Sequence, residues 1–112
     1  MSKIIYFASP YSDKDKNKVE ERYQLTAKKV AELTSEGNVV LSPIVYGHTL
    51  LQFHEMPGDW KFWKNFCESF LYKSDEMIVF KLPGWENSEG VNQEIKLAES
   101  LGIKISYIEY GS

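Results

Sequence analysis

Four short apolar runs, separated by amphipathic segments, constrain the fold of this chain more than any other feature of its sequence. Each run is almost continuously apolar and rich in Ile, Val, Phe or Tyr, which is typical of strands buried on both faces of a parallel sheet. The runs are KIIYFA (3–8), NVVLS (38–42), EMIVF (76–80) and IKISYI (103–108). We therefore predict a parallel sheet whose strands are connected by crossover helices.

The segments between these runs have the periodicity of amphipathic helices. Residues 15–36 place an apolar stripe opposite Lys and Glu, and Gly37 follows as a stop signal. Residues 59–73 and 88–101 have a similar pattern, and Gly102 ends the second of them. The alternation predicts a three-layer α/β/α sandwich around a parallel, flavodoxin-like sheet of four to five strands, in the order 2-1-3-4.

The length of 112 residues corresponds to one domain, residues 1–112, whose active site is built from few loops or shared with a second subunit. The final segment YIEYGS (107–112) is interpreted as a short remnant of a fifth strand or as a contact between subunits. The formal net charge is −3, with acids and bases interspersed. This charge pattern excludes the basic face that binding of a nucleic acid polymer requires.

Neither a membrane segment nor a metal site is expected. The apolar run at the amino terminus ends at Ser9 and Pro10, which makes it too short for a signal peptide or a membrane span. We therefore expect a cytoplasmic protein. The single Cys67 cannot form an internal disulfide, and both His are far from it in the sequence. We expect no metal ion and no cofactor.

The helix predicted over 59–73 carries more apolar surface than one sheet can easily cover. Its first apolar face consists of Trp60, Trp63, Cys67, Phe70 and Leu71. Phe62 and Phe66 form a second ridge beside that face. We interpret the second ridge as packing against a partner subunit in a homodimer or larger homo-oligomer. The alternative is a single broad core face.

In an open parallel sheet, ligands bind beyond the carboxyl ends of the strands, where the strand order reverses. For the predicted order this crevice lies between the first and third strands. The loops that follow these strands are SPYSDKD (9–15) and LPGWENSEG (82–90). Both loops lead into helices whose first amides attract an anion, so together they favour a small molecule that bears a phosphate.

Each loop also has a purely structural interpretation. In the first loop Ser9 and Ser12 offer hydroxyls, but Ser12 or Asp13 could simply cap the following helix. In the second loop Asn87 or Ser88 could cap the next helix in the same way. Pro10 stiffens the first turn, and Gly90 allows the backbone of the second loop to approach a ligand closely.

Glu94 borders the apolar stripe of the helix over 88–101, since it lies three residues after Val91 and next to Ile95. A carboxylate there is partly desolvated, which costs free energy unless a partner or a function compensates. Glu94 is interpreted either as a boundary residue that reaches solvent or pairs with Lys28 or Lys29, or as a catalytic nucleophile or general acid.

Three segments taken in order resemble the nucleoside 2-deoxyribosyltransferase-like family, including the branch that hydrolyses 2'-deoxynucleoside 5'-monophosphates. They are IIYFASPY (4–11), NVVLSPIVYGHTL (38–50) and SDEMIVFKLPGWENSEGVNQEIKLA (74–98). The most specific element is S-x-G-x-x-x-E at 88–94, after an apolar strand. The resemblance covers most of the chain.

This resemblance implies that Glu94 is a nucleophile that attacks C1' of the sugar and expels the base. The covalent intermediate then passes to water or to another base. A carboxylate suits this chemistry because the transition state is an oxocarbenium-like cation. Tyr6 matches a tyrosine on the first strand of the family, and its hydroxyl would orient the carboxylate. The alternative for Tyr6 is an ordinary core aromatic residue.

Ser88 bears on the substrate class. Members of the family that act on free nucleosides carry an acid there, whereas the monophosphate branch carries serine. A hydroxyl beside helix amides favours a phosphate, which an acid would repel. Ser88 and Ser9 therefore favour a 5'-monophosphate, and we expect Pro10, Tyr11 and Gly90 to contact the same substrate.

The chain departs from the family at one position. Relatives carry an Asp on the helix that matches 59–73, near the base, where this sequence has Cys67 followed by Glu68. A side chain at Glu68 would point about 100° away from that of Cys67. Either a register shift recruits Glu68 as acid or base, or proton transfer by this helix is lost and Cys67 is a buried thiol.

Aromatic residues and His48 could contact the base. Trp60, Trp63 and Trp85 could stack on it, and His48 could donate a hydrogen bond. Core or interface packing is the preferred interpretation of Trp60 and Trp63, so Trp85, in the crevice loop, is the better stacking candidate.

Three other polar residues receive structural interpretations. We expect His54 to be an exposed loop residue and Asp75 to serve in capping or packing at the start of the third strand. Arg22 is expected to solvate the first helix.

The sequence therefore predicts an N-glycosidase acting on a 2'-deoxynucleoside 5'-monophosphate, with possible deoxyribosyl transfer to another base. One alternative is a nucleotide-binding module with weak or no turnover. Another is a glycosidase acting on a different ribosyl nucleotide such as NAD.

Overall fold

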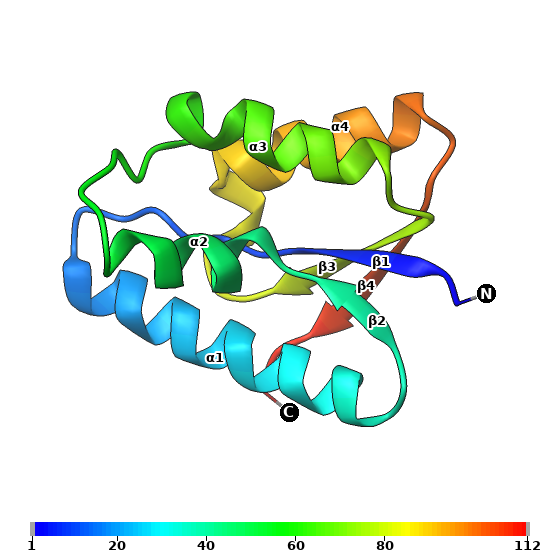
Figure 1. Cartoon of the computed structure of the whole chain (residues 1–112), viewed down its shortest axis with the longest axis horizontal. Helices are drawn as coiled ribbons and strands as arrows, with labels where there is room; N and C mark the ends of the chain where they lie inside the picture. The colour runs from blue at the N-terminus through cyan, green and yellow to red at the C-terminus, as the bar shows by residue number, and fades with distance from the viewer. Residues whose placement is uncertain (1, 112) are drawn as a thin grey trace.

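The computed structural model describes residues 2–111, which form a four-stranded, all-parallel sheet with helices on both faces (Figure 1). The strands are β1 (Ile4–Ala8), β2 (Val39–Leu41), β3 (Glu76–Lys81) and β4 (Lys104–Glu109). Their order in the sheet is β2-β1-β3-β4. The predicted order and the three-layer, flavodoxin-like architecture are therefore confirmed.

The helices are α1 (Lys16–Ser35), α2 (Pro43–Leu51), α3 (Trp60–Tyr72) and α4 (Glu89–Ser100), with a short 3-10 turn η1 (Trp85–Asn87) before α4. Helices α3 and α4 lie side by side on one face of the sheet, and α1 lies on the other (Figure 1). Helix α2 packs beside α1. None of the helices within residues 2–111 is long and apolar enough to cross a membrane.

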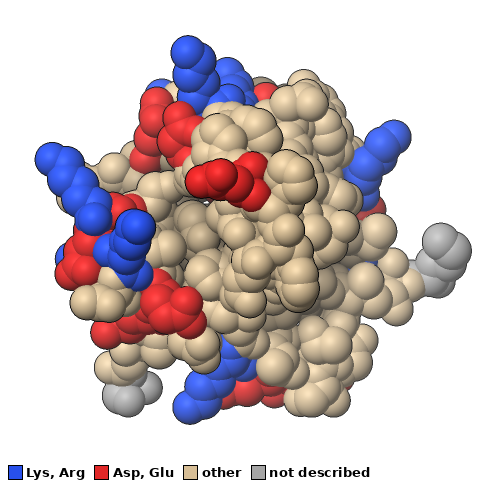
Figure 2. Space-filling view, turned by 60° about the vertical axis from the view of Figure 1, so that its left-hand side comes forward, with Lys and Arg blue, Asp and Glu red and all other residues tan. Residues whose placement is uncertain are grey.

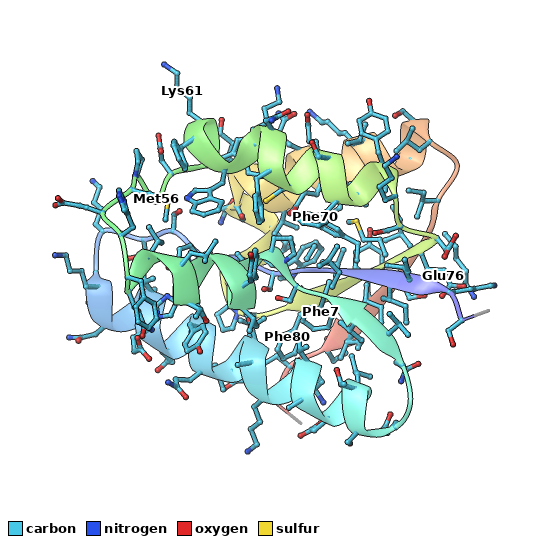
Figure 3. The ribbon with its side chains drawn as sticks, viewed as in Figure 1. Phe7, Met56, Lys61, Phe70, Glu76 and Phe80 are labelled. Carbon is cyan, nitrogen blue, oxygen red and sulfur yellow. The ribbon has the colours of Figure 1, made fainter. Side chains whose placement is uncertain are left out.

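The alternating side chains of the strands build a separate core on each face of the sheet. Tyr6, Ala8 and Met77 are buried against α3 and α4, whereas Phe7 and Phe80 are buried on the side of α1. Figure 3 shows Phe7 and Phe80 on the α1 side of the sheet. This alternation matters for the site, because it directs the Tyr6 hydroxyl toward α4.

Helix α2 was not predicted. Its amino-terminal signal is local: Ser42 accepts a hydrogen bond from the Val45 amide at 3.3 Å, and Pro43 occupies the first turn. Its apolar residues do not form a single stripe with helical spacing. The sequence therefore does not predict a helix after β2. The omission is important because α2 carries His48 to the ligand-binding end of the sheet.

Two local contacts test expectations about the ends of α1 and β3. The amino-terminal cap of α1 is Asp15, which accepts from the Asn17 amide at 2.9 Å, so capping by Ser12 or Asp13 is wrong. Asp75 joins the starts of β3 and β1, because its carboxylate accepts from the Ile4 amide at 2.8 Å. This confirms its structural role.

The segment 107–112 does not form a fifth strand within the described residues. Its first three residues, 107–109, are the end of β4, and Tyr110 packs edge-on against Phe80 on the α1 side of the sheet. The interpretation as a fifth-strand remnant is therefore wrong, and residue 112 lies outside the described part.

Candidate active site

A pocket of about 280 Å³ lies at the carboxyl ends of β1 and β3, between the loops that follow them and helices α2, α3 and α4. Figure 2 shows a hollow on this side of the molecule with acidic side chains at its margin. The position is the crevice expected from the reversal of strand order between β1 and β3. Its lining brings together residues from four separate segments of the chain, 9–12, 43–51, 58–67 and 87–94.

Glu94 lies in the wall of this pocket and is 6% exposed. Its carboxyl accepts a hydrogen bond from the Tyr6 hydroxyl. Burial raises the pKa of Glu94 to about 8, against the lowering effect of the Tyr6 hydrogen bond, and the charge of Glu68 raises it further. The resting carboxyl is therefore mostly protonated at pH 7.

The two structural interpretations of Glu94 are wrong. Glu94 does not reach solvent at the margin of the sheet, because it is buried under α3 and in contact with Tyr6. It does not pair with α1 either, because α1 covers the opposite face and Lys29 pairs with Glu32 at 3.0 Å. The placement expected for Glu94 and Tyr6 as partners is confirmed.

Cys67 completes a buried cluster with Tyr6 and Glu94. Burial and then the nearby Glu94 raise the pKa of the Cys67 thiol to about 12, although a hydrogen bond with Tyr6 lowers it. Burial and then Glu94 likewise raise the pKa of Tyr6 well above its ordinary value. Both groups therefore keep their protons, and Cys67 is the buried thiol that the sequence suggested.

Glu68 is not among the residues that line the pocket. It follows Cys67 on α3 and is half-buried, and it influences the pocket only through its charge on Glu94 and Cys67. No register shift brings it to the position of Cys67. The helix therefore supplies no carboxyl beside the pocket at the position where the resemblance implied an acid.

Ser9 and Ser88 both line the pocket, from the loops after β1 and β3. Each hydroxyl already has a protein partner. Ser88 caps α4 by accepting from the Val91 amide at 3.2 Å, and Ser9 shares a hydrogen bond of 3.1 Å with Thr26. Both hydroxyls are thereby held in fixed positions, each with a remaining capacity to bond a ligand.

Gly90 lines the pocket, and the absence of a side chain there leaves room for the Trp60 ring as well as for a ligand. A Cβ atom on Gly90 would lie 3.1 Å from Cε3 of Trp60, closer than ordinary packing allows. Pro10 is fully buried beneath the loop and does not line the pocket. The expected contact of Pro10 with substrate is therefore wrong, because its ring faces the protein interior.

The core packing expected of Trp60 and Trp63 is confirmed, whereas Trp85 does not lie where expected. Trp60 and Trp63 pack against the core on the α3 side and also line the pocket. Trp85 lies outside the pocket lining, with its ring 5.8 Å from that of Tyr107 and 5.7 Å from the Lys81 ammonium. The expectation for Trp85 is wrong, because the η1 turn folds its indole back onto β3 and β4.

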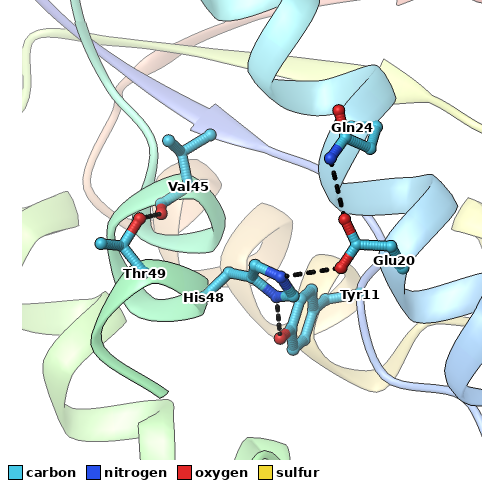
Figure 4. A network of polar contacts seen from close by, with 6 residues as sticks. All are labelled: Tyr11, Glu20, Gln24, Val45, His48 and Thr49. Carbon is cyan, nitrogen blue, oxygen red and sulfur yellow. Dashed lines mark hydrogen bonds and ion pairs between the residues drawn. The ribbon is translucent and has the colours of Figure 1, made fainter. Parts of the chain in front are cut away.

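Tyr11 and His48 line the pocket together, and the Tyr11 hydroxyl lies 2.7 Å from Nδ1 of His48 (Figure 4). The other ring nitrogen, Nε2, lies 3.2 Å from Oε1 of Glu20 on α1. Tyr23 stacks on the imidazole with ring centroids 3.9 Å apart. The predicted substrate-facing positions of Tyr11 and His48 are confirmed as pocket positions, whereas His54 is an exposed loop residue, as expected.

Arg22 has a role that sequence reasoning missed. Its guanidinium donates to the carbonyls of Tyr11, Ser12 and Pro83, at 3.4, 2.9 and 3.2 Å. It thereby connects the two loops that form the crevice. The expectation that Arg22 only solvates α1 is wrong. The periodicity of α1 carries no signal for this contact, because Arg22 lies on its polar side.

Asp59 and Glu89 line the pocket in addition to Glu94, whereas none of its described lining residues is Lys or Arg. Among residues 2–111 there is also no group of three or more His, Cys, Asp or Glu that could hold a metal ion. Any anion bound here would therefore depend on amides, hydroxyls and the imidazole of His48.

Comparison with curated proteins finds none that matches this chain. The family model described as Domain of unknown function (DUF1937) matches residues 3–110, a range that includes both Tyr6 and Glu94. Since this match spans nearly the whole chain, the protein belongs to the DUF1937 family.

Proposed function

We propose that the protein is an N-glycosidase that cleaves the base–sugar bond of a 2'-deoxynucleoside 5'-monophosphate of the cytoplasm, with Glu94 as nucleophile. The observation that carries this proposal is the buried carboxyl of Glu94, which opens onto the pocket and is held by the Tyr6 hydroxyl. A carboxyl buried without a basic partner is costly to a fold, so its position is better explained by chemistry than by stability.

In the proposed reaction Glu94 first releases its proton to solvent, and the carboxylate then attacks C1' from the face opposite the base. The C1'–N bond breaks, its electron pair leaves with the base, and the base nitrogen takes up a proton. Water then attacks C1' and releases Glu94 as a carboxylate; attack by a second base gives transfer instead. Burial favours this chemistry, because a carboxylate stabilises an oxocarbenium-like cation more strongly where water is excluded.

The phosphate would lie at the amino terminus of α4, beside Ser9 and Ser88. The first amides of a helix and two hydroxyls suit a phosphate oxygen. In this proposal the Ser88 hydroxyl contacts the phosphate and also caps α4 by accepting from the Val91 amide. Glu89 lies next to this position and would oppose the charge of the phosphate.

A nucleotide-binding module without turnover is the second candidate. It is favoured by the state of the titratable groups, since Glu94 has a pKa of about 8 and Cys67 has a pKa of about 12. At rest Glu94 is then mostly protonated, and the Cys67 thiol on α3 holds its proton too tightly to act as an acid. The two candidates differ in one measurable respect, which is release of free base.

The test is to incubate the protein with each 2'-deoxynucleoside 5'-monophosphate, and with the corresponding nucleosides, and to measure free base by chromatography. Glu94→Ala should abolish release, while Glu99→Ala, an exposed acid of the same helix, should not change it. Nucleotide binding without release of base would support the module. Release that persists in Glu94→Ala would contradict the proposed mechanism.

A further inference from the structure

A departing base must take up a proton, and neither partner of Glu94 can readily supply it. The Tyr6 hydroxyl is committed to Glu94, and burial raises the pKa of the Cys67 thiol to about 12. General-acid assistance of such a step is typically worth 10²–10⁴-fold in rate. Among the other protic side chains that line the same pocket, the phenol of Tyr11 and the imidazole of His48 lie within hydrogen-bond distance of each other.

These two side chains belong to an ordered polar chain that begins on α1 (Figure 4). Gln24 donates to Oε2 of Glu20 at 2.8 Å, and Oε1 of Glu20 lies 3.2 Å from Nε2 of His48. Nδ1 of His48 lies 2.7 Å from the Tyr11 hydroxyl. The ring of Tyr23 stacks on His48 at 3.9 Å, which limits rotation of the imidazole. Both ring nitrogens of His48 therefore have defined partners.

We propose that Glu20, His48 and Tyr11 form a proton relay that protonates the leaving base, a role that rests on the proposed glycosidase function. In the cationic imidazole, Nε2–H donates to Glu20 and Nδ1–H donates to the Tyr11 oxygen. The Tyr11 O–H then points its proton at the base nitrogen. Tyr11 is the catalytic residue of the relay, and His48 and Glu20 are positioning residues.

The proton balance of the relay closes over both steps. When the C1'–N bond breaks, its electron pair takes the Tyr11 proton, Tyr11 takes the proton from Nδ1, and the imidazole becomes neutral. In the second step water attacks C1', Glu94 leaves as a carboxylate, and the proton of the water returns through Tyr11 to Nδ1. No oxidant, metal or other reactant is needed.

The groups around the imidazole are consistent with these roles. The hydrogen bond from Gln24 lowers the pKa of Glu20, so Glu20 is ionised and accepts from Nε2. Burial, and then Glu20, raise the pKa of Tyr11, so the phenol keeps its proton between turnovers. On the pocket side the other titratable groups are Asp59, Glu89, Cys67 and Glu94.

The test uses a leaving group that needs no proton. The N7-methyl derivative of a guanine deoxynucleotide carries a fixed positive charge and leaves as a neutral base. Tyr11→Phe and His48→Gln should lose about 10²–10⁴-fold in kcat/KM on the unmethylated nucleotide and less than about 10-fold on the methylated one. For a pyrimidine-specific enzyme, the uracil and 5-fluorouracil nucleotides replace this pair. Tyr72→Phe, which is exposed at the end of α3, serves as the control.

Glu20→Gln provides a second test that leaves the fold intact, because Glu20 is an exposed residue of α1. Without the carboxylate Nε2 of His48 loses its charged acceptor and the imidazole is less firmly oriented, so kcat on the unmethylated nucleotide should fall, with little change in KM and little change on the methylated nucleotide. Equal losses on both members of a substrate pair would overturn the relay and leave the glycosidase intact. Absence of base release from the unmodified protein would overturn both.

Discussion

At the scale of single residues, Glu94 limits what the site can do. Its carboxyl is buried, its pKa is raised to about 8 by burial, and its one side-chain hydrogen-bond partner among residues 2–111 is the Tyr6 hydroxyl. The acid must therefore ionise before it can act as a nucleophile. A positive charge that develops on a bound sugar would favour this ionisation, which links formation of the nucleophile to the presence of substrate.

Glu94→Gln should remove a pH-dependent loss of stability. Between pH 4.5, the ordinary pKa, and about 8, the folded protein keeps a proton that the unfolded chain has released. The stability that this group supplies is complete below pH 4.5 and is lost as the pH rises to about 8, by at most about 1.4 kcal/mol per pH unit.

Urea unfolding of both proteins at pH 5 and pH 9 measures this effect. The free energy of unfolding of Glu94→Gln, relative to the unmodified protein, should be larger at pH 9 by a few kcal/mol. Glu99→Gln, which changes an exposed acid of the same helix, should show no such difference. A relative stability of Glu94→Gln that is the same at both pH values would show that Glu94 titrates normally.

Glu89→Gln should favour nucleotides over nucleosides. Glu89 lies in the pocket lining in the first turn of α4, next to the proposed phosphate position, and none of the described lining residues is Lys or Arg. Removing about 1 kcal/mol of repulsion at this exposed position should tighten binding of a 5'-monophosphate about fivefold and leave binding of the nucleoside unchanged.

Titration calorimetry with both ligands, at low and high salt, checks this prediction, with Glu86→Gln as the control because Glu86 is exposed and outside the pocket lining. An equal gain for the nucleoside would place the phosphate elsewhere.

The sequence predicts a residue of the site only where a helix or strand fixes the direction of its side chain. Helical periodicity was enough to place Glu94 at the edge of a buried stripe, and Ser88 was one of the two predicted caps. The direction of Trp85 depends on Gly84, whose φ of +93° starts the η1 turn. The role of Arg22 depends on loop carbonyls that no sequence pattern locates.

At the scale of elements, two glycines determine how closely other helices approach α3. Gly47 of α2 faces Trp63, and a Cβ atom there would lie 3.5 Å from Cζ3, which is an ordinary contact. Gly90 of α4 faces Trp60, where the corresponding distance is 3.1 Å. The same substitution should therefore have different results at the two positions.

Gly47→Ala should raise the free energy of unfolding by about 0.5–1 kcal/mol, because alanine favours the helix interior and fits beside Trp63. Gly90→Ala should instead displace the Trp60 indole within the pocket and raise KM more than it lowers stability. Thermal unfolding and steady-state kinetics on the two variants measure both effects. An unchanged KM in Gly90→Ala would show that Trp60 does not contact the substrate.

Helix α2 shows where element prediction failed. The segment after β2 has the local signals of a helix start, Ser42 followed by Pro43, but its nine residues are too few for helical periodicity to stand out. The longer helices α1, α3 and α4 were predicted within about two residues at each end, because each buries one stripe along its full length.

At the scale of the whole molecule, the strand order was predictable because few topologies satisfy parallel strands joined by right-handed crossovers. The strand order does not determine what covers the outer surface of α3. There Phe62 is 48% exposed, and Phe66 stacks on Tyr46, which is 52% exposed, with centroids 6.0 Å apart. This aromatic ridge, formed by Tyr46, Phe62 and Phe66, continues from α2 onto α3 beside the pocket.

We propose that the aromatic ridge is covered by a second copy of the chain, as the excess of apolar residues in the segment 59–73 suggested. Phe66 is half-buried and packs against the core, but Tyr46 and Phe62 beside it are exposed, and contiguous exposed apolar surface typically marks an interface. Phe62→Ser should then convert a dimer of about twice 13.0 kDa to monomers, as measured by light scattering on a size-exclusion column.

The control is Tyr107→Ser, which removes an exposed aromatic side chain from β4. This strand forms the edge of the sheet opposite β2. If the dimer dissociates with Tyr107→Ser and persists with Phe62→Ser, the interface is the sheet edge. Because the ridge adjoins the pocket through α2 and α3, dissociation by Phe62→Ser should also raise KM if the neighbouring copy borders the substrate. A mass of one chain at all concentrations would show that the ridge is solvent-exposed.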